Sequence, residues 1–359
     1  MGFADFVTSM KLLIMGFSFY RQPRAKFFKS FPLRPMTLLA SRESSSPNLS
    51  YFYRPHKSTT YRPIVLLHGV GIGLAPYIPL IAKLPRDVGI LAIELLPISC
   101  RITTVLPLAV DLARECGDII SQQDLKDFVF VGSSFGSFLT KLFLDSTYLS
   151  NRMHSIIMLD PVSVLVHFPD LAYKFTTRTS VGSHECQLRW AMQTDPDIAF
   201  TLGRRFCWHE YVVWREDLSS RPTTLIMGSG DSFVNPEAIA TYITKAVPEA
   251  NPDSLRIGPG LQWTWQDRDK WKTENGFDQW RGEGLELVWL EGYGHSSGFL
   301  SSKMLPRIVE CIVGYCEKVN KEKTQKEDVV AKGDIDDFEP ASKPEPGIAR
   351  VVDRRVTMA

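Results

Sequence analysis

The chain has 359 residues, of which 44% are hydrophobic and 23% charged, so it can bury a large core as ordinary globular proteins do. Its 41 basic and 40 acidic residues give a formal net charge of +1, which provides no overall field for attracting nucleic acid and favours a small-molecule substrate. The six cysteines are scattered without the CxxC pairs of zinc and redox sites, which predicts buried thiols rather than disulfides.

Residues 1–49 differ from the rest of the chain in charge. No acidic residue lies between Phe6 and Arg42, and the apolar run from Leu12 to Tyr20 is nine residues long, well short of the roughly 20 that a membrane-spanning helix requires. A cleavage site of the A-x-A type is also missing, which disfavours secretion. The segment is typical of a transit peptide, of a membrane-surface helix, or of a basic helix packed on the protein. We therefore expect an intracellular, cytoplasmic protein, with mitochondrial location or peripheral membrane contact through this segment as the alternatives.

Short β-rich runs alternate with helix-length segments from residue 50 to residue 320, which predicts an α/β fold whose sheet is covered by helices on both faces. Seven runs are expected to be strands, because they are short, apolar and bounded by turn residues: Ser50–Tyr53, Ile64–Leu67, Gly89–Leu95, Phe128–Gly132, Ser155–Asp160, Thr223–Gly228 and Leu285–Leu290. The clearest helix candidates between them are Tyr77–Lys83, Leu106–Gln122 and Gly136–Leu144.

Two stretches are longer than a connection in such a fold requires. Residues 162–221 are rich in aromatic side chains and look helical, which predicts a helical cap inserted into a core of residues 50–161 and 222–320. Residues 251–284 carry four tryptophans among charged residues and glycines and are expected to form an ordered excursion. Residues 321–359 are highly charged and contain a single aromatic residue, which predicts a disordered tail.

The strongest motif is Gly132-Ser133-Ser134-Phe135-Gly136, a G-x-S-x-G sequence that follows an apolar strand and precedes a helix-forming segment. A tight strand-to-helix turn brings backbone atoms close together. Side-chain-free positions such as Gly132 and Gly136 therefore let Ser134 stand in a strained conformation with its hydroxyl exposed. Ser134 is the predicted nucleophile.

A serine hydroxyl is a weak nucleophile, so it needs a base, and the base needs a partner that fixes its tautomer. His295 is the predicted base because it follows the last apolar strand in a glycine-bounded loop. Asp231 is the predicted acid because it follows the strand 223–228, which gives the chain order Ser, Asp, His. Asp160 remains the alternative acid, since it closes the preceding strand at the same edge of the sheet.

The negative charge that develops during acyl transfer needs backbone donors that are already in place. The N–H of Phe135, which follows the nucleophile, is the first predicted donor. The second should come from the glycine-rich loop 68–73, with Val70 as the first choice and Gly71 as the next. This loop lacks the G-K-[ST] ending of a phosphate-binding loop, and no His, Asp or Glu cluster has metal-ligand spacing. We predict no metal and no cofactor.

Taken in order, these motifs resemble those of the α/β-hydrolase superfamily, through the loop after His68, the Gly132–Gly136 turn, the Gly-Ser-Gly-Asp231 turn and the Gly-His295 loop. The resemblance covers about residues 50 to 320. It implies a mostly parallel eight-stranded sheet flanked by helices, a helical cap, and hydrolysis of an ester, thioester or amide without a cofactor.

The chain looks closest to a group of fungal α/β-hydrolase proteins, in the segments Leu159–Val162, Thr201–Phe206 and Trp214–Leu218. Ser133 departs from the superfamily pattern, because many members carry histidine before the nucleophile. The departure changes what packs beside Ser134 and leaves the three catalytic candidates intact.

We expect a serine esterase that cleaves an apolar or aromatic acyl substrate held under the cap, where Trp190, Trp208 and His209 are candidate substrate contacts. One alternative keeps the same residues and is a thioesterase or cyclising acyltransferase of a polyketide-like pathway. Another is a catalytically silent protein that binds a ligand in the hydrolase pocket. The sequence predicts no nucleic-acid partner and leaves the oligomeric state open.

Overall fold

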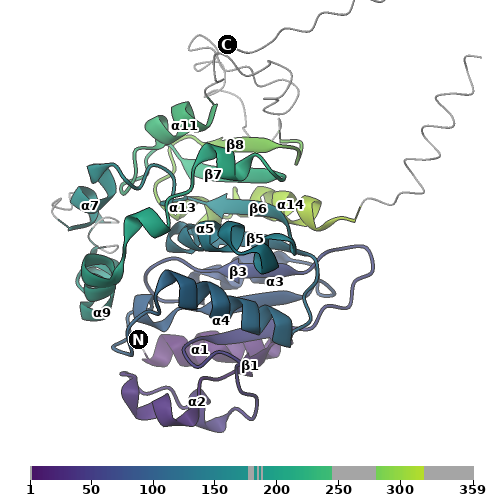
Figure 1. The fold of residues 1–359 in the computed structure, drawn as a ribbon, viewed down its shortest axis with the longest axis vertical. Helices are drawn as coiled ribbons and strands as arrows, with labels where there is room; N and C mark the ends of the chain where they lie inside the picture. The colour runs from purple at the N-terminus through teal and green to yellow at the C-terminus, as the bar shows by residue number, and fades with distance from the viewer. Residues whose placement is uncertain (1, 177–181, 184–185, 187–188, 245–279, 319–359) are drawn as a thin grey trace, which may run out of the picture. The chain divides into compact units, whose positions relative to one another are not determined.

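A computed structural model describes residues 2–176, 182–183, 186, 189–244 and 280–318. An eight-stranded sheet crosses these residues in the order β1-β2-β4-β3-β5-β6-β7-β8 (Figure 1). Its strands are β1 Ser18–Tyr20, β2 Ser50–Arg54, β3 Ile64–Leu67, β4 Ile90–Glu94, β5 Phe128–Ser133, β6 Met153–Leu159, β7 Thr223–Gly228 and β8 Leu285–Leu290. The strands from β4 to β8 in this order run parallel, whereas β2 pairs antiparallel with both β4 and β1.

Helices cover both faces of the sheet. The α-helices are α1 Gly2–Ile14, α2 Met36–Leu39, α3 Ile78–Lys83, α4 Ala109–Gln122, α5 Phe138–Asp145, α6 Thr147–Ser150, α7 Pro169–Thr176, α9 Pro196–Phe200, α10 Arg215–Leu218, α11 Pro236–Thr244, α13 Ser297–Leu300 and α14 Leu305–Cys316. Apolar side chains of α4, α5 and α11 pack on one face, and those of α1, α3 and α14 pack on the other. The predicted helix starting at residue 106 begins three residues later, at Ala109.

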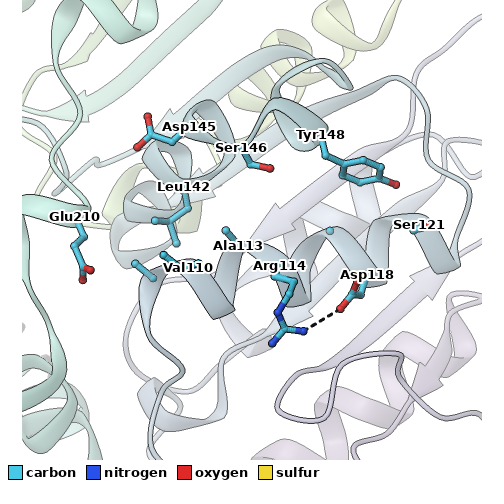
Figure 2. Close-up of a pocket in the computed structure, with 12 residues that line it drawn as sticks. Val110, Ala113, Arg114, Asp118, Ser121, Leu142, Asp145, Ser146, Tyr148 and Glu210 are labelled. Carbon is cyan, nitrogen blue, oxygen red and sulfur yellow. Dashed lines mark hydrogen bonds and ion pairs between the residues drawn. The ribbon is translucent and has the colours of Figure 1, made fainter.

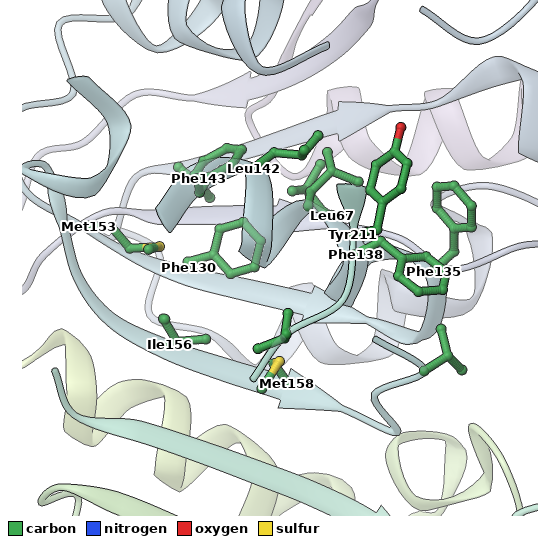
Figure 3. Packing of buried hydrophobic residues seen from close by; sticks show 14 of the residues in the cluster. Leu67, Phe130, Phe135, Phe138, Leu142, Phe143, Met153, Ile156, Met158 and Tyr211 are labelled. Atoms are coloured by element: carbon green, nitrogen blue, oxygen red, sulfur yellow. The ribbon is translucent and has the colours of Figure 1, made fainter. Parts of the chain in front are cut away.

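Alternate side chains of each central strand serve the two cores, because successive residues of a strand point to opposite faces. In β5, Phe128 and Phe130 face α4 and α5, whereas Val129 and Val131 face α3 and α14. Figure 3 shows the first of these cores, with Phe130 beside Phe143 and, further along, Phe135 and Phe138 beside Tyr211. Burial on both faces explains why these strands are apolar without interruption.

The N-terminal residues add an edge strand that the sequence patterns do not predict. The apolar run from Leu12 to Tyr20 is divided, since its first three residues end α1 and its last three form β1. In β1, Phe19 pairs with Phe52 of β2. Figure 1 shows α1 and α2 next to this edge of the sheet. Among the helices that the structure describes, none combines the length and apolar character needed to cross a bilayer.

The stretch 162–221 leaves the sheet after β6 and returns to it at β7. Its described residues are mostly helical, in α7, α9 and α10 and in two π-helical turns, Arg189–Gln193 and Thr201–Arg205. Figure 1 shows α7 and α9 together at one end of the strands. The predicted tail 321–359 and residues 251–279 of the predicted excursion lie outside the described residues.

None of the six cysteines, all of which lie in the described part of the chain, forms a disulfide, and four are buried. Cys186 and Cys207 are exposed, so the expectation of buried thiols is wrong for these two. Both lie in the stretch 162–221, where short helices bury little of each side chain.

Candidate active site

Ser134 lies at the sharp turn between β5 and α5, where a 3-10 turn, Ser134–Ser137, starts the helical segment. Its backbone has a φ of 48°, a left-handed conformation that is strained for a residue other than glycine. A Cβ atom on Gly136 would lie 2.3 Å from the carbonyl oxygen of Leu67, and one on Gly132 would lie 2.8 Å from the carbonyl oxygen of Gly136. Both positions therefore require glycine for the turn to close.

Ser134, His295 and Asp231 form a continuous chain of hydrogen bonds. The hydroxyl of Ser134 donates to Nε2 of His295 at 2.8 Å, and the Nδ1–H of His295 donates to Oδ2 of Asp231 at 2.6 Å. The three residues follow β5, β8 and β7, so the parallel strands deliver them to one edge of the sheet. All three are buried, which limits competition from water for these bonds.

The loops that carry Asp231 and His295 are held against each other by their backbones. The N–H of Gly230 donates to the carbonyl of Tyr293 at 2.9 Å. A Cβ on Gly228 would lie 2.2 Å from the same carbonyl oxygen, so only glycine allows this approach. The close packing fixes the carboxylate relative to the imidazole.

Backbone donors also fix the other oxygen of Asp231. Its Oδ1 accepts hydrogen bonds from the N–H groups of Phe233 at 2.8 Å and Val234 at 3.1 Å. Burial alone would raise the pKa of Asp231, but His295 and these backbone donors outweigh it and lower the pKa below the usual value. Asp231 is therefore ionised at neutral pH and can orient the imidazole.

The pKa of His295 is raised by its carboxylate neighbours. Burial alone would lower it, but the Asp231 carboxylate, which also accepts the Nδ1 hydrogen bond, and the more distant Asp160 outweigh that effect. A higher pKa makes the imidazole a stronger base towards the Ser134 hydroxyl. It also means that a larger fraction of the imidazole is already protonated near neutral pH.

Asp160, the alternative acid, binds backbone groups instead of the imidazole. Its Oδ1 accepts from the N–H of Gly228 at 3.1 Å, and its Oδ2 accepts from the N–H of Ser296 at 3.0 Å. Burial, together with repulsion from Asp231, raises its pKa to about 6. Asp231 makes the hydrogen bond to His295. Asp160 instead connects the loop that carries Asp231 with the loop that carries His295.

The structure leaves one of the two predicted second oxyanion donors available. The N–H of Gly71 donates to the carbonyl of Ile98 at 3.0 Å, so this donor already serves the protein's own backbone. Val70 is left as the candidate. Phe135 is in the first turn of the 3-10 segment, where N–H groups have no partner within the helix.

His68 is a residue of the site region whose role the sequence patterns do not indicate. Its Nδ1–H donates to the carbonyl of Gly69 at 2.7 Å, and its Nε2 accepts from the N–H of Leu95 at 2.9 Å. The ring is completely buried, and burial lowers its pKa, which keeps it neutral. The N–H of Gly69 donates in turn to the hydroxyl of Tyr77 at 2.9 Å. These bonds hold the loop that carries Val70. The His-Gly pair at the start of that loop is the sequence signal that could have pointed to this role of His68.

Aromatic rings other than the three candidate substrate contacts lie beside the residues of the site. The ring of Phe233 lies 4.9 Å from that of His295 between centroids, and the ring of Phe206 lies 6.3 Å from that of Phe135. Trp190, Trp208 and His209 are exposed, and the ring contacts of Trp208 are with His167 and His209. Within the described part of the chain, none of these three predicted substrate contacts is in ring contact with the site.

A separate surface groove lies between α4 and the α5–α6 corner. Figure 2 shows its lining, which includes Val110 and Arg114 of α4, Leu142 and Asp145 of α5, and Tyr148 of α6. None of the residues that line it belongs to the Ser134 site. Across residues 2–176, 189–244 and 280–318, no cluster of three or more His, Cys, Asp or Glu side chains could hold a metal ion.

No family model matches the sequence, and a search of the curated proteins gives no match either. Solved structures do match the fold. A membrane phospholipase A described as a bacterial virulence factor is 13% identical, with 87% of this chain and 91% of that chain covered and a TM-score of 0.52. A putative lipase (lip1) from Acinetobacter baumannii AYE is 12% identical, with 86% and 96% covered and a TM-score of 0.49. Carboxylesterase CesB from Bacillus subtilis is 13% identical, with 76% and 90% covered and a TM-score of 0.48.

At such low identity the likeness concerns the fold alone. Together with the strand order and the parallel pairing, the match to the phospholipase confirms the predicted α/β-hydrolase fold. The narrower likeness to fungal proteins receives no support from these comparisons and stays a prediction.

Proposed function

We propose that the chain is a serine hydrolase that cleaves a carboxylic ester through an acyl-enzyme on Ser134. The observation that carries the proposal is the hydrogen-bond chain from the Ser134 hydroxyl through His295 to Asp231. Nucleophile, base and orienting acid have the geometry that acyl transfer needs.

In the first half of the reaction, Oγ of Ser134 attacks the ester carbonyl carbon while Nε2 of His295 takes the hydroxyl proton. The carbonyl oxygen becomes negatively charged, and the N–H groups of Phe135 and Val70 would donate hydrogen bonds to it. The carbon–oxygen bond of the ester then breaks. The leaving alcohol takes the proton from His295, and the acyl group stays on Ser134.

In the second half, a water molecule attacks the acyl carbonyl and gives one proton to His295. The bond to Ser134 breaks, Oγ recovers that proton from the imidazole, and the carboxylic acid leaves. In both halves Asp231 remains ionised and stabilises the imidazolium that forms beside it.

The surroundings of Ser134 support an apolar or aromatic acyl group. The ring of Phe233 lies against that of His295, and the ring of Phe206 lies beside that of Phe135, the residue after the nucleophile. Apolar walls with a few fixed polar groups are typical of sites for small apolar ligands.

Turnover of p-nitrophenyl esters of increasing acyl length, compared with thioesters of the same acyl groups, tests the proposal. Wild-type protein should hydrolyse the esters, and Ser134→Ala should lose on the order of 10⁵-fold or more in kcat. A strong preference for thioesters would assign the same residues to a thioesterase. Equal background rates for both proteins would contradict the proposed hydrolysis and leave the catalytically silent ligand-binding protein as the alternative.

A further inference from the structure

Helix α1 exposes four of its large apolar side chains. They are spaced three or four residues apart, and we call them the α1 stripe: Phe3, Phe6, Met10 and Ile14. This spacing places them on one side of the helix. The opposite side buries two hydroxyl side chains, Thr8 and Ser9, together with Leu12. A surface helix normally has the reverse arrangement, and exposed apolar patches of this kind mark interaction surfaces.

Apolar side chains from two other segments extend the α1 stripe. Phe31 and Ile102 are paired through two backbone hydrogen bonds, of 2.7 and 2.9 Å, and their side chains are 67% and 50% exposed. The start of α1 lies beside the segment that contains Phe31, because a Cβ atom added to Gly2 would lie 3.4 Å from Cβ of Pro32. The exposed apolar surface is therefore formed by three segments that are far apart in the sequence.

Helix α1 lies next to the loop that carries Val70. The first turns of α1 and the end of that loop line one small cavity, to which Ala4 and Asp5 contribute from the helix and Ile72 from the loop. The side chain of Ile72 is itself 40% exposed. The protein-facing side of α1 is therefore next to the carboxyl edge of the sheet, where Ser134 lies.

Residues 2–42, which carry the α1 stripe and Phe31, have a net positive charge, whereas near Ile102 the carboxylate of Asp197 accepts a hydrogen bond from the N–H of Thr103. The acid within residues 2–42, Asp5, lies 3.2 Å from the guanidinium of Arg34 and 3.3 Å from that of Arg101. The ionisable side chains that these residues expose are all basic: Lys11, Arg24, Lys29 and Arg42. A second copy of the chain would bring the same cations face to face, which is unfavourable. An anionic lipid surface would complement both the apolar and the positive side chains.

We propose that α1 and its apolar neighbours dock the protein on an anionic membrane surface, with the helix lying in the plane of the headgroups. At 13 residues and about 1.5 Å per residue, α1 is too short to span a bilayer but long enough to bury one apolar side in its surface. Docking would bring the carboxyl edge of the sheet towards the lipid. Together with the hydrolase function proposed above, on which this step rests, docking implies a membrane-associated ester substrate. The membrane binding itself does not depend on that function.

Flotation of the full-length Ser134→Ala protein with lipid vesicles tests the docking without degrading the lipid. We expect binding to vesicles of phosphatidylcholine mixed with phosphatidylserine, weaker binding to phosphatidylcholine alone, and release by salt. The double substitution Phe3→Ser with Phe6→Ser should weaken binding about tenfold or more. Lys11→Glu with Lys29→Glu should abolish the preference for anionic vesicles.

Two control variants change similar side chains near the amino ends of the strands, opposite the carboxyl ends where Ser134 lies. Tyr148→Ser removes an exposed aromatic ring near the start of β6, and Lys126→Glu reverses a charge just before β5. Both should bind vesicles as the parent protein does. The proposal is overturned if the parent protein does not bind, if the α1 variants bind equally well, or if those variants convert a dimer into a monomer in size-exclusion chromatography, which would assign the surface to a second copy.

A soluble short-chain ester separates this proposal from the catalytic one. The Phe3→Ser, Phe6→Ser variant with Ser134 intact should hydrolyse it at the wild-type rate. If this variant loses vesicle binding and keeps hydrolysis, the two phenylalanines serve docking and not catalysis. A wild-type protein that binds vesicles but hydrolyses no ester contradicts only the proposed function.

Discussion

Asp160 accepts a hydrogen bond from the backbone N–H of Ser296, the residue that follows His295, at 3.0 Å. The other oxygen of the same carboxylate accepts from Gly228 at the start of the turn that carries Asp231. One buried carboxylate therefore connects the loop of the candidate base with the loop of the candidate acid, and adds a second negative charge near the imidazole.

The rate of ester hydrolysis should rise with pH as His295 loses its proton, because only the neutral imidazole can accept the proton of Ser134. Since the pKa of His295 is raised, the midpoint of this rise in kcat/KM should lie above 6.5. The pKa of Asp160 is about 6, so its carboxylate is ionised over most of that range. Asp160→Asn removes this charge and should move the midpoint down by roughly one unit. A midpoint that stays in place would show that Asp160 has no electrostatic effect on the base.

Separate substitution of the two carboxylates distinguishes the acid from its neighbour. Asp231→Asn should reduce kcat by on the order of 10³ to 10⁴, because the imidazole loses the acceptor that fixes its tautomer. Asp160→Asn should cost far less, since the hydrogen bond to Nδ1 remains. The assignment of Asp231 is wrong if the two losses are reversed, with both variants folded by circular dichroism.

His68 should affect catalysis through the loop that it holds. His68→Ala removes the acceptor for the N–H of Leu95 and the donor to Gly69, and should lower kcat by about 10²-fold if the Val70 donor moves out of place. His56 is a matched control at the other edge of the sheet, where its Nδ1 accepts from the N–H of Gly89 at 2.9 Å. Both histidine substitutions should lower the free energy of unfolding by about 1–3 kcal/mol, but His56→Ala should keep the wild-type kcat. Equal kcat values for the two variants would argue against a positioning role for His68.

The buried ion pair between Arg34 and Glu94 should make the N-terminal residues part of the folded unit. Two hydrogen bonds of 2.7 and 2.8 Å join the guanidinium to the carboxylate at the end of β4. Arg34→Met leaves Glu94 buried without this partner and should lower the free energy of unfolding by about 3–5 kcal/mol. Urea denaturation measures the change. The exposed pair of Arg114 with Asp111 is the control, and Arg114→Met should unfold at the wild-type urea concentration; an Arg34 variant that does the same would contradict the prediction.

Sequence patterns predict the apolar parallel strands well because these strands are buried on both faces. The predicted bounds of Ile64–Leu67, Thr223–Gly228 and Leu285–Leu290 agree with β3, β7 and β8. The edge strand β1 escapes prediction, because its three residues are too few to show a period of two. The same patterns could not tell which side of α1 faces the protein, since its apolar residues read equally well as a buried or an exposed side.

Some residues of the candidate site can be predicted from the sequence, and others cannot. The positions of Ser134, Asp231 and His295 after three parallel strands predict that they meet, because parallel strands end at one edge. The choice between Val70 and Gly71 depends on one hydrogen bond to Ile98, which leaves no mark in the sequence. The ring of Phe206 lies beside that of Phe135 while Trp208, two residues later, is exposed, and composition alone cannot distinguish such near neighbours in irregular helices.

Intact-protein mass spectrometry after treatment with a fluorophosphonate probe tests the central claim most directly, because the probe reacts with serines that are activated by a base. Wild-type protein should gain the mass of one probe. Ser133→Ala, which removes the adjacent buried hydroxyl, should gain it too, and Ser134→Ala should gain none. Unlabelled wild type, or a Ser134→Ala protein labelled as fully as wild type, would contradict the account.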